Sequence, residues 1–347
     1  MLCLDLDIME RNARVMAEHI SRSGKQWRPH VKSHCLPQIA STLMEFGAIG
    51  VTAASVAEAE VMARAGVPSV LLAHLVANPM QLKRLPNINT STELLLTIDH
   101  FVHAELLSEL AGECGQEFQV LVDIDIGMHR TGVRPGHDAA ELAAAADKLP
   151  GVRVVGVMGY EGHLLQLADA DEKRRLIFEG MNVLQHSRDL IRRHDIPCDI
   201  LSAGGTGSFQ TTSDHPAVTE LQAGGGIFGD LFYTRNCRAS DLESAMWVTA
   251  DVVSRPSLNQ AVLNCGRKVL NPDLCLPAMR NLPDATIQRL SAEHAVVEVS
   301  GPARDLRIGD TVSVTVGYSD LTILLHRRLH VFRGEALIDV WEIQRPV

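Results

Sequence analysis

One lysine in the sequence is placed for covalent chemistry. Lys32 lies in "RPHVKSH", between His30 and His34, in a short run that we expect to be a strand. A lysine amine that is desolvated at the end of a buried strand, or that faces other positive groups, has a lowered pKa and can form a Schiff base. The alternatives are an ordinary surface lysine and, for the two histidines, a metal clip.

Two further segments place polar side chains just after apolar runs. "DIDIGMHRTGV" (123–133) ends in a glycine turn that projects Arg130, whose planar guanidinium suits an anionic ligand oxygen. A structural salt bridge is the alternative. "GYEGH" contains Tyr160 and His163. His163 is a candidate general base because its reference pKa lies near neutral pH, and the alternative is a histidine that serves only the packing of the fold.

Two glycine-rich turns follow later strand-like runs, "SAGGTGS" (202–208) and "LQAGGGIFGD" (221–230). Glycine lets backbone N–H groups converge on a phosphate without side-chain clashes. Neither turn has the spacing of an ATP or NAD motif. Near the C-terminus, "VGYSDLTILLH" brings Tyr318, Asp320 and His326 together in sequence, where they could approach a metal or a substrate or simply be polar strand residues.

The elements that must position these residues alternate between helical and strand-like patterns from residue 8 to about 235. A helix is expected over 8–24 and a strand over 26–32, and the segment contains about eight strand–helix units in total. This number closes a (β/α)8 TIM barrel, in which residues after the strand ends line the active site. A doubly wound open sheet is the alternative. After about residue 240, short strands separated by Gly, Pro and Asp predict a mainly antiparallel β domain. The predicted domains are therefore 8–238 and 239–347, the latter with residues 1–7.

The composition excludes several classes of protein. The chain has 347 residues, of which 46% are hydrophobic, and a net charge of -10, which argues against nucleic-acid binding. Seven scattered cysteines without a CxxC pair favour reduced thiols and a cytoplasmic location. The acidic N-terminus does not look like a signal peptide, and no apolar run reaches the roughly 18 residues of a membrane helix.

Taken together, these motifs resemble the fold-type III pyridoxal-phosphate enzymes, and within them the D-threonine aldolase/D-serine dehydratase-like group of the alanine racemase N-terminal barrel family. "RPHVKSH" resembles the cofactor-lysine motif of the group and "DIGMHRTGV" its DxGxxRxGV motif. "GYEGH", "GGTGS" and "ELQAGG" match later barrel motifs. "LNCGRKVLNPD" resembles a D-x-G-x-K segment, with Asn264 in place of the first aspartate. The motifs keep their order over nearly the whole chain.

The resemblance implies a role for each matching residue. Lys32 would bind pyridoxal 5'-phosphate as a Schiff base, which makes a metal clip of His30 and His34 unlikely. Arg130 would face the phenolic oxygen of the cofactor, and His163 would be the base near the substrate hydroxyl. The remaining cofactor-binding residues would be Tyr160 and, through the backbone amides that hold the phosphate, Gly205, Thr206, Gly207, Gly224 and Gly225. The group also implies a homodimer.

One departure concerns the metal. The group carries H-C-D or H-x-C where this chain reads Tyr318-Ser319-Asp320, and the outer two positions bind a divalent metal in those relatives. Here only Asp320 keeps a metal-ligand side chain, and one carboxylate is a poor site for Mn²⁺ or Zn²⁺. Tyr318 suits a hydrogen-bonding or acid/base role instead.

The predicted function is a lyase that cleaves a D-3-hydroxy amino acid to glycine and an aldehyde, as a D-threonine aldolase does. D-serine dehydratase-like deamination is one alternative. A second is an amino-acid racemase or epimerase that uses Lys32 and Tyr318 as opposed bases. A third is a cofactor carrier without turnover. The substrate is a small-molecule amino acid, and neither nucleic acid nor a membrane is an expected partner.

Overall fold

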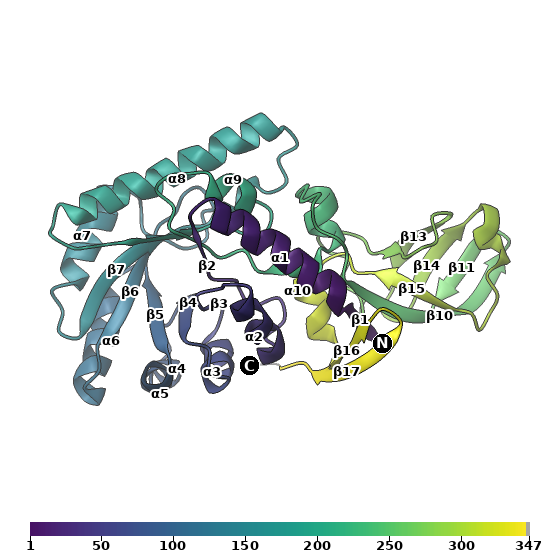
Figure 1. The fold of residues 1–347 in the computed structure, drawn as a ribbon, viewed down its shortest axis with the longest axis horizontal. Coiled ribbons are helices and arrows are strands. Elements are labelled where there is room, and N and C mark those ends of the chain that lie inside the picture. Colours follow the sequence, from purple (N-terminus) through teal and green to yellow (C-terminus); the bar gives the residue numbers. More distant parts are fainter. Residues whose placement is uncertain (345–347) are drawn as a thin grey trace. The chain divides into compact units, whose positions relative to one another are not determined.

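The computed structural model describes residues 1–344 and shows an α/β protein made of two compact units (Figure 1). One unit is Ala17–Gly224. The other joins Met1–Met16 to residues 225–344. Among residues 1–344, no helix is both long and apolar enough to cross a membrane.

Eight parallel strands form the sheet of the Ala17–Gly224 unit, in the order β2-β9-β8-β7-β6-β5-β4-β3. The strands are β2 (Gln26–Trp27), β3 (Val51–Ala53), β4 (Ser69–Leu75), β5 (Glu93–Ile98), β6 (Phe118–Asp123), β7 (Val152–Met158), β8 (Ile200–Ala203) and β9 (Glu220–Leu221). The chain after β2 closes the sheet against β3, because His30 and Thr52 form a parallel bridge and the amide of Val31 donates to the carbonyl of Thr52. The predicted (β/α)8 barrel is confirmed, and an open doubly wound sheet does not have this strand order.

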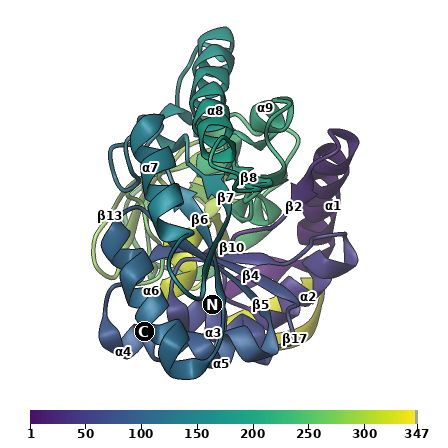
Figure 2. The ribbon, with the colours of Figure 1, turned by 90° about the vertical axis from the view of Figure 1, so that its left-hand side faces the viewer.

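Helices follow the strands and cover the outside of the barrel (Figure 2). They are α2 (Pro37–Glu45), α3 (Val56–Arg64), α4 (Pro79–Leu82), α5 (Leu85–Ser91), α6 (Phe101–Cys114), α7 (His137–Ala146), α8 (Ala170–Arg192), α9 (Phe209–Ser213) and the 3-10 turn η1 (Gly162–Leu164). Local sequence sets their ends. Ser55 and Asp169 accept the amides of Glu58 and Glu172 at the starts of α3 and α8, and Gly115, at φ 71°, ends α6.

The barrel core reflects the continuous apolar runs of its strands. Leu71, Leu95, Leu121 and Met158, one from each of β4 to β7, form a buried cluster. Strands of a parallel sheet are covered on both faces, so their sequences lack the alternation of a half-exposed strand. The predicted strand over 26–32 is shorter than expected, since only Gln26–Trp27 is regular strand and residues 28–31 continue as isolated backbone bonds.

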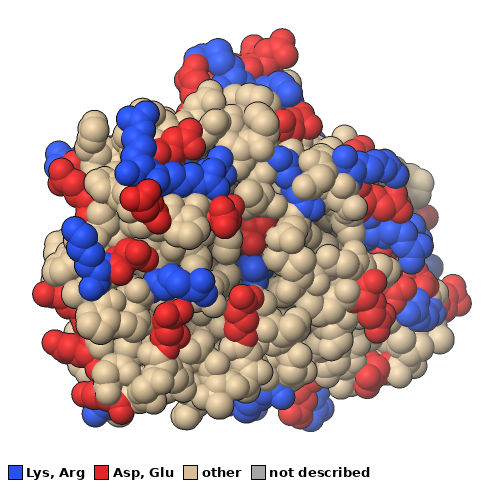
Figure 3. All heavy atoms as spheres, turned by 60° about the vertical axis from the view of Figure 1, so that its left-hand side comes forward, with Lys and Arg blue, Asp and Glu red and all other residues tan. Residues whose placement is uncertain are grey.

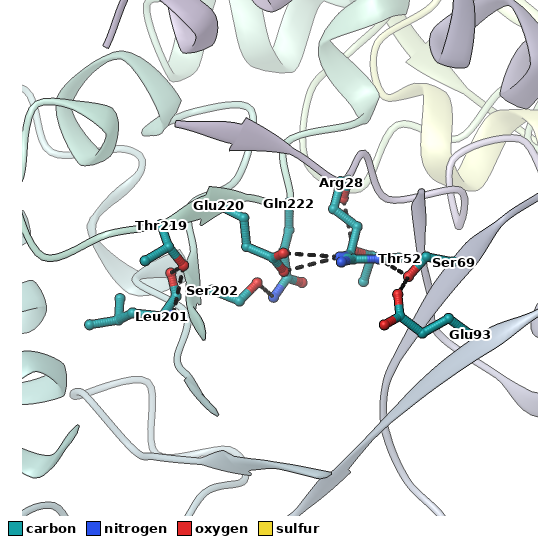
Figure 4. A network of polar contacts seen from close by, with 9 residues as sticks. All are labelled: Arg28, Thr52, Ser69, Glu93, Leu201, Ser202, Thr219, Glu220 and Gln222. Carbon is teal, nitrogen blue, oxygen red and sulfur yellow. Dashed lines mark hydrogen bonds and ion pairs between the residues drawn. The ribbon is translucent and has the colours of Figure 1, made fainter. Parts of the chain in front are cut away.

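A buried ion pair ties the closing strands of the barrel (Figure 4). Arg28 Nε lies 3.1 Å from both carboxylate oxygens of Glu220, and Arg28 Nη1 donates to Ser69 Oγ at 2.6 Å. Ser69 in turn donates to Glu93 at 2.6 Å. Ser69, Glu93 and Glu220 each begin a strand, so the network lies at the amino ends of β4, β5 and β9. At this end of a barrel, side chains typically serve stability rather than chemistry.

The other unit contains a nine-stranded sheet in which β1 pairs in parallel with β16 and every other pairing between named strands is antiparallel. The strands are β1 (Leu2–Asp5), β10 (Met246–Ser257), β11 (Gln260–Leu263), β12 (Ala278–Met279), β13 (Ala285–Leu290), β14 (Ala295–Val299), β15 (Thr311–Thr315), β16 (Arg328–Arg333) and β17 (Ala336–Glu342). Its helical elements are η2 (Gly225–Phe228), η3 (Phe232–Asn236), η4 (Gly301–Asp305), α10 (Ser319–Thr322) and η5 (Ile323–Leu325). Helix α1 (Leu6–Arg22) spans the division between the units.

Candidate active site

Lys32 lies in a turn immediately after the bridge that closes the barrel. Its backbone amide donates to His30 Nδ1 at 3.3 Å, and two residues after His34 the amide of Leu36 donates to His34 Nδ1 at 2.9 Å. The two imidazoles therefore support the turn on either side of the lysine. The Lys32 side chain itself is exposed, so the expectation of a desolvated amine is wrong for the protein alone.

The His34 side chain is buried and the His30 side chain is half-buried, and both imidazoles are uncharged at neutral pH. Burial is the main cause that lowers the pKa of His30, and the positive charges of Lys32, His34 and Arg130 lower it further. Burial also lowers the pKa of His34 to about 3. Lys32 and Arg130 therefore both lie near enough to His30 to disfavour its charged form. With both Nδ1 atoms accepting backbone amides, the pair is built into the turn rather than arranged as a metal clip.

Three aspartates hold the loop that carries Arg130. The loop leaves β6, and a parallel bridge between Ile124 and Val133 closes its base. Asp125 accepts the amides of Gly127 at 2.9 Å and His129 at 3.0 Å, which contributes to the lowered pKa of its carboxyl. Asp123 accepts the hydroxyl of Thr131, and Asp99 from the end of β5 accepts the amide of Gly132. The arginine itself is exposed on a loop with a fixed shape.

Tyr160 and His163 follow β7 and meet the neighbouring loops. The Arg130 guanidinium carbon lies 5.9 Å from the centre of the Tyr160 ring. A Cβ on Gly205 would lie 2.9 Å from that ring, and a Cβ on Gly127 would lie 2.9 Å from His163 Nε2. Glycine at these two positions therefore lets both loops approach side chains that the sequence placed at the site. The His163 ring is exposed.

The glycine turn at 224 lies against the lysine turn. A Cβ on Gly224 would lie only 2.2 Å from the carbonyl oxygen of His30, two residues before Lys32. Gly224 directly follows the segment in which the amide of His30 bonds the carbonyl of Gln222. Backbone of the last barrel turn and backbone of the lysine turn are therefore in van der Waals contact. Within the barrel unit, the structure brings together Lys32, Arg130, Tyr160, His163, Gly205 and Gly224 at the carboxyl ends of the strands.

Tyr318, Asp320 and Gly225 belong to the other unit. Tyr318 Oη donates to Asp320 Oδ2 at 2.9 Å, and a Cβ on Gly225 would lie 3.2 Å from Asp320 Oδ1. Burial and the neighbouring Asp320 carboxylate raise the pKa of Tyr318. Asp230, which the sequence did not single out, accepts both the amide and the hydroxyl of Ser319, and burial raises its pKa to about 7.

The donor set around Asp320 does not fit the metal that the resemblance implied. In residues 1–344, no three or more His, Cys, Asp or Glu side chains group closely enough to hold a metal ion. The position of the usual histidine ligand holds a tyrosine that already donates to Asp320. A neutral phenol with a raised pKa is a weak ligand for a divalent cation.

Sequence reasoning missed the residues that support the site from behind. Asp123 is the last residue of β6, and Asp99 and Asp125 lie one and two residues beyond the ends of β5 and β6. Their position at strand ends is a signal that the sequence contained. Glu161 lay inside the quoted "GYEGH" and Ser208 inside "SAGGTGS". Their contact with each other joins residues 47 apart in sequence, so spacing could not reveal it.

A closed barrel that carries an exposed lysine, an arginine loop and glycine turns at the carboxyl ends of its strands has the architecture of a Schiff-base enzyme for a phosphorylated cofactor. Comparisons with known proteins agree. Residues 4–231 match the profile of the alanine racemase N-terminal domain, and residues 245–332 match the putative serine dehydratase domain. The chain therefore belongs to the alanine racemase N-terminal domain family, whose members of this kind are fold-type III pyridoxal-phosphate enzymes.

The similar proteins include aldolases that align along almost their full length. The chain is 30% identical to D-threonine aldolase of Arthrobacter sp., over 99% of this chain and 91% of that protein. It is 28% identical to 3-hydroxy-D-aspartate aldolase of Paracoccus denitrificans (strain Pd 1222), over 99% and 90%. The crystal structure of D-threonine aldolase from Filomicrobium marinum superposes with a TM-score of 0.94 at 33% identity, covering 99% of this chain and 94% of that one.

Proposed function

We propose that this protein is a pyridoxal-phosphate-dependent lyase that cleaves D-3-hydroxy amino acids to glycine and an aldehyde. The two aldolases that align over 99% of the chain support this reaction. The observation that carries the proposal is the convergence of the Lys32 turn, the Arg130 loop and two glycine turns at one end of the barrel. The residues fit the cofactor, because they offer an accessible amine for its aldehyde, a cation for its phenolic oxygen and close-packed backbone turns for its phosphate.

Each residue of the barrel site has a proposed task. Lys32 would hold the cofactor through its amine, and Arg130 would supply a permanent positive charge for the phenolic oxygen of the cofactor. Tyr160 packs between the arginine and the turn at Gly205. Backbone amides around Thr206, Gly207, Gly224 and Gly225 would hold the phosphate. When bound, pyridoxal phosphate supplies an electron sink for negative charge at the substrate Cα.

His163 is the proposed general base of the cleavage. Its ring is exposed at the site and packs on Gly127. The imidazole takes the proton of the substrate 3-hydroxyl, the Cα–Cβ bond breaks, and the bonding electrons remain at Cα while the new aldehyde leaves. Proton transfer by a positioned side chain typically contributes about 10²–10⁴-fold to the rate. The Lys32 amine lies on a turn two residues from half-buried His30, so it would stay near the reacting atoms.

The racemase alternative requires Tyr318 to act as a base. A catalytic base at neutral pH needs a pKa near that pH, yet burial and Asp320 raise the pKa of this phenol and keep its proton bound. Tyr318 is therefore better suited to donate a hydrogen bond than to remove a proton from Cα. We propose that the unit that contains Tyr318 plays a supporting role and takes part in no metal-dependent step.

The test is product analysis on the enzyme loaded with pyridoxal phosphate. D-threonine is expected to give glycine and acetaldehyde, while L-threonine gives neither. Lys32→Ala abolishes the reaction, and the exposed-site control Lys148→Ala does not. His163→Gln lowers kcat by roughly 100-fold. Formation of 2-oxobutanoate and ammonia would identify a dehydratase instead. Inversion with exchange of the Cα hydrogen would identify a racemase. A lysine-bound cofactor without turnover would identify a carrier.

We also propose a cytoplasmic homodimer with a cofactor-binding domain at 8–238 and a β domain at 239–347 with residues 1–7. Seven cysteines without a disulfide suit a reducing compartment. On the face drawn in Figure 3, acidic and basic side chains are interspersed, so no continuous basic surface is offered there to a nucleic acid. Light scattering of the purified protein tests the dimer, and a mass of one chain would contradict it.

A further inference from the structure

Glu161 is a buried carboxylate for which the proposed reaction has no use. It follows β7 and is 0% exposed. Its Oε1 accepts two short hydrogen bonds, from Ser208 Oγ at 2.6 Å and from Thr212 Oγ1 at 2.5 Å. Its Oε2 has no hydrogen-bond partner among residues 1–344. Burying a carboxylate is costly unless it is well bonded, so this one is expected to serve a purpose that an apolar residue could not.

The effect of Glu161 reaches the glycine turn through Ser208. A hydroxyl has one proton, and the short bond to Glu161 takes it, which leaves the Ser208 oxygen as an acceptor. That oxygen accepts the amide of Gly205 at 3.1 Å. The carbonyl of Gly205 in turn accepts the amides of Ser208 at 3.0 Å and Phe209 at 2.8 Å. The Gly205 peptide groups are thus engaged inside the turn, and the carboxylate determines the direction of the first bond.

A lysine holds the same turn from its other side. Lys173, in the first turn of α8, donates from Nζ to the carbonyls of Leu165 and Gly207, each at 2.8 Å. The loop after β7 and the turn after β8 are therefore joined twice, once by Glu161 and once by Lys173. The amide of Gly207 makes no hydrogen bond within the described residues. A turn fixed in this way can present that amide to an anion without rearranging first.

We propose that Glu161 is a positioning residue for phosphate recognition, acting through Ser208 to preset the 204–208 turn that receives the phosphate group of the cofactor. A carboxylate that faced a phosphate would repel it, and Glu161 avoids this by bonding the hydroxyls behind the turn. The energetic gain is preorganisation, since binding does not have to order the turn. This inference rests on the proposed function because it takes pyridoxal phosphate as the cofactor, but it does not depend on which reaction the enzyme catalyses.

The experiment compares two ligands that differ only by the phosphate. Apo-protein is titrated with pyridoxal phosphate and with pyridoxal, and the absorbance of the lysine Schiff base gives each dissociation constant. Glu161→Ala is expected to weaken pyridoxal phosphate by about ten-fold or more and pyridoxal by less than two-fold. Inorganic phosphate should compete with pyridoxal phosphate less well in the variant. Glu179→Ala, which removes an exposed glutamate of α8, is the matched control and should change neither constant.

A second variant keeps the test decisive if Glu161→Ala does not fold. Ser208→Ala leaves the carboxylate in place but removes the relay, and the same selective loss for the phosphorylated ligand is expected. Equal weakening of both ligands would show a general packing role and overturn the inference. Unchanged affinity for pyridoxal phosphate would also overturn it while leaving the lyase proposal intact. A wild-type protein that binds no pyridoxal phosphate would overturn both.

Discussion

Neutralising Glu220 is predicted to destabilise the barrel strongly without removing any group from the site. The Arg28 and Glu220 side chains are only 4% and 2% exposed, and both carboxylate oxygens lie 3.1 Å from Arg28 Nε. In Glu220→Gln, the guanidinium keeps its bond to Ser69 but loses its counter-charge in a buried position. Breaking a buried pair by removing one partner costs about 3–5 kcal/mol of the free energy of unfolding. Because the bond to Ser69 is retained, we expect the loss in the free energy of unfolding to lie near the lower end of this range.

The barrel unit contains its own fluorescent reporter. Trp27 lies beside Arg28 on β2 and is 2% exposed, whereas Trp247 and Trp341 belong to the other unit. Urea unfolding is therefore followed by tryptophan fluorescence in a Trp247→Phe, Trp341→Phe background, which isolates the barrel transition. A two-unit protein need not unfold in one step, so the midpoint and the slope are both compared.

Two further variants separate charge from packing. Arg28→Met combined with Glu220→Leu removes both charges at similar volume, and its cost should be well below that of Glu220→Gln alone. Arg175→Ala breaks an exposed pair with Glu179 and should cost no more than about 0.5 kcal/mol. A Glu220→Gln cost under about 1 kcal/mol, or a double variant as unstable as the single one, would refute the reasoning.

Three other outcomes are expected. Dialysis against EDTA should change lyase turnover by less than two-fold, because Tyr318 rather than a metal ligand is bonded to Asp320; a large loss restored by Mn²⁺ would contradict this. The pKa of Asp230 is raised to about 7 in the folded state, so its contribution to stability is present below the unfolded value of 3.8 and is lost as pH rises towards 7. Asp230→Asn should flatten the fall in the urea midpoint between those limits, and an unchanged pH profile would exclude the effect. The pKa of His34 is lowered from 6.5 to about 3, so its contribution is present above pH 6.5 and is lost on acidification; His34→Asn, which keeps an acceptor for the amide of Leu36, should unfold at lower pH than the wild type.

The barrel was predictable because each of its strands and helices has a recognisable local sequence pattern. Each buried strand is a short apolar run, each helix has the helical period, and the glycines after them mark the returns. The closure of the barrel was predictable only from the number of strand–helix units, because no local sequence pattern shows that the chain after β2 bonds to β3. The exposed position of Lys32 was not predictable. It depends on whether the strand ends before or after that residue, and strand ends are set by partners far away in sequence.

The reactive residues proposed for the site could be picked out in the sequence, whereas the residues that support them could not. Lys32, Arg130 and His163 stand after strand-like runs, where residue type and position both point to chemistry. Glu161 and Asp230 lack that signal, because a buried acid is defined by what surrounds it. Ser208 and Ser319, their hydroxyl partners, lie 47 and 89 residues away. Such pairs exist only once the fold has formed.

The segment from Arg28 to Lys32 shows why one short motif could be read in more than one way. Arg28 bonds residues that begin strands, and Lys32 lies in the turn beyond the strand ends, so the segment runs from one end of the barrel to the other. A strand advances about 3.3 Å per residue, and four residues cover roughly 13 Å. The arginine therefore serves closure, whereas the lysine lies at the end of the barrel where we propose the chemistry, and His30 between them supports the turn. A substitution at Arg28 should lower stability, one at Lys32 should remove the reaction, and the separation of the two effects follows from the direction of the strand.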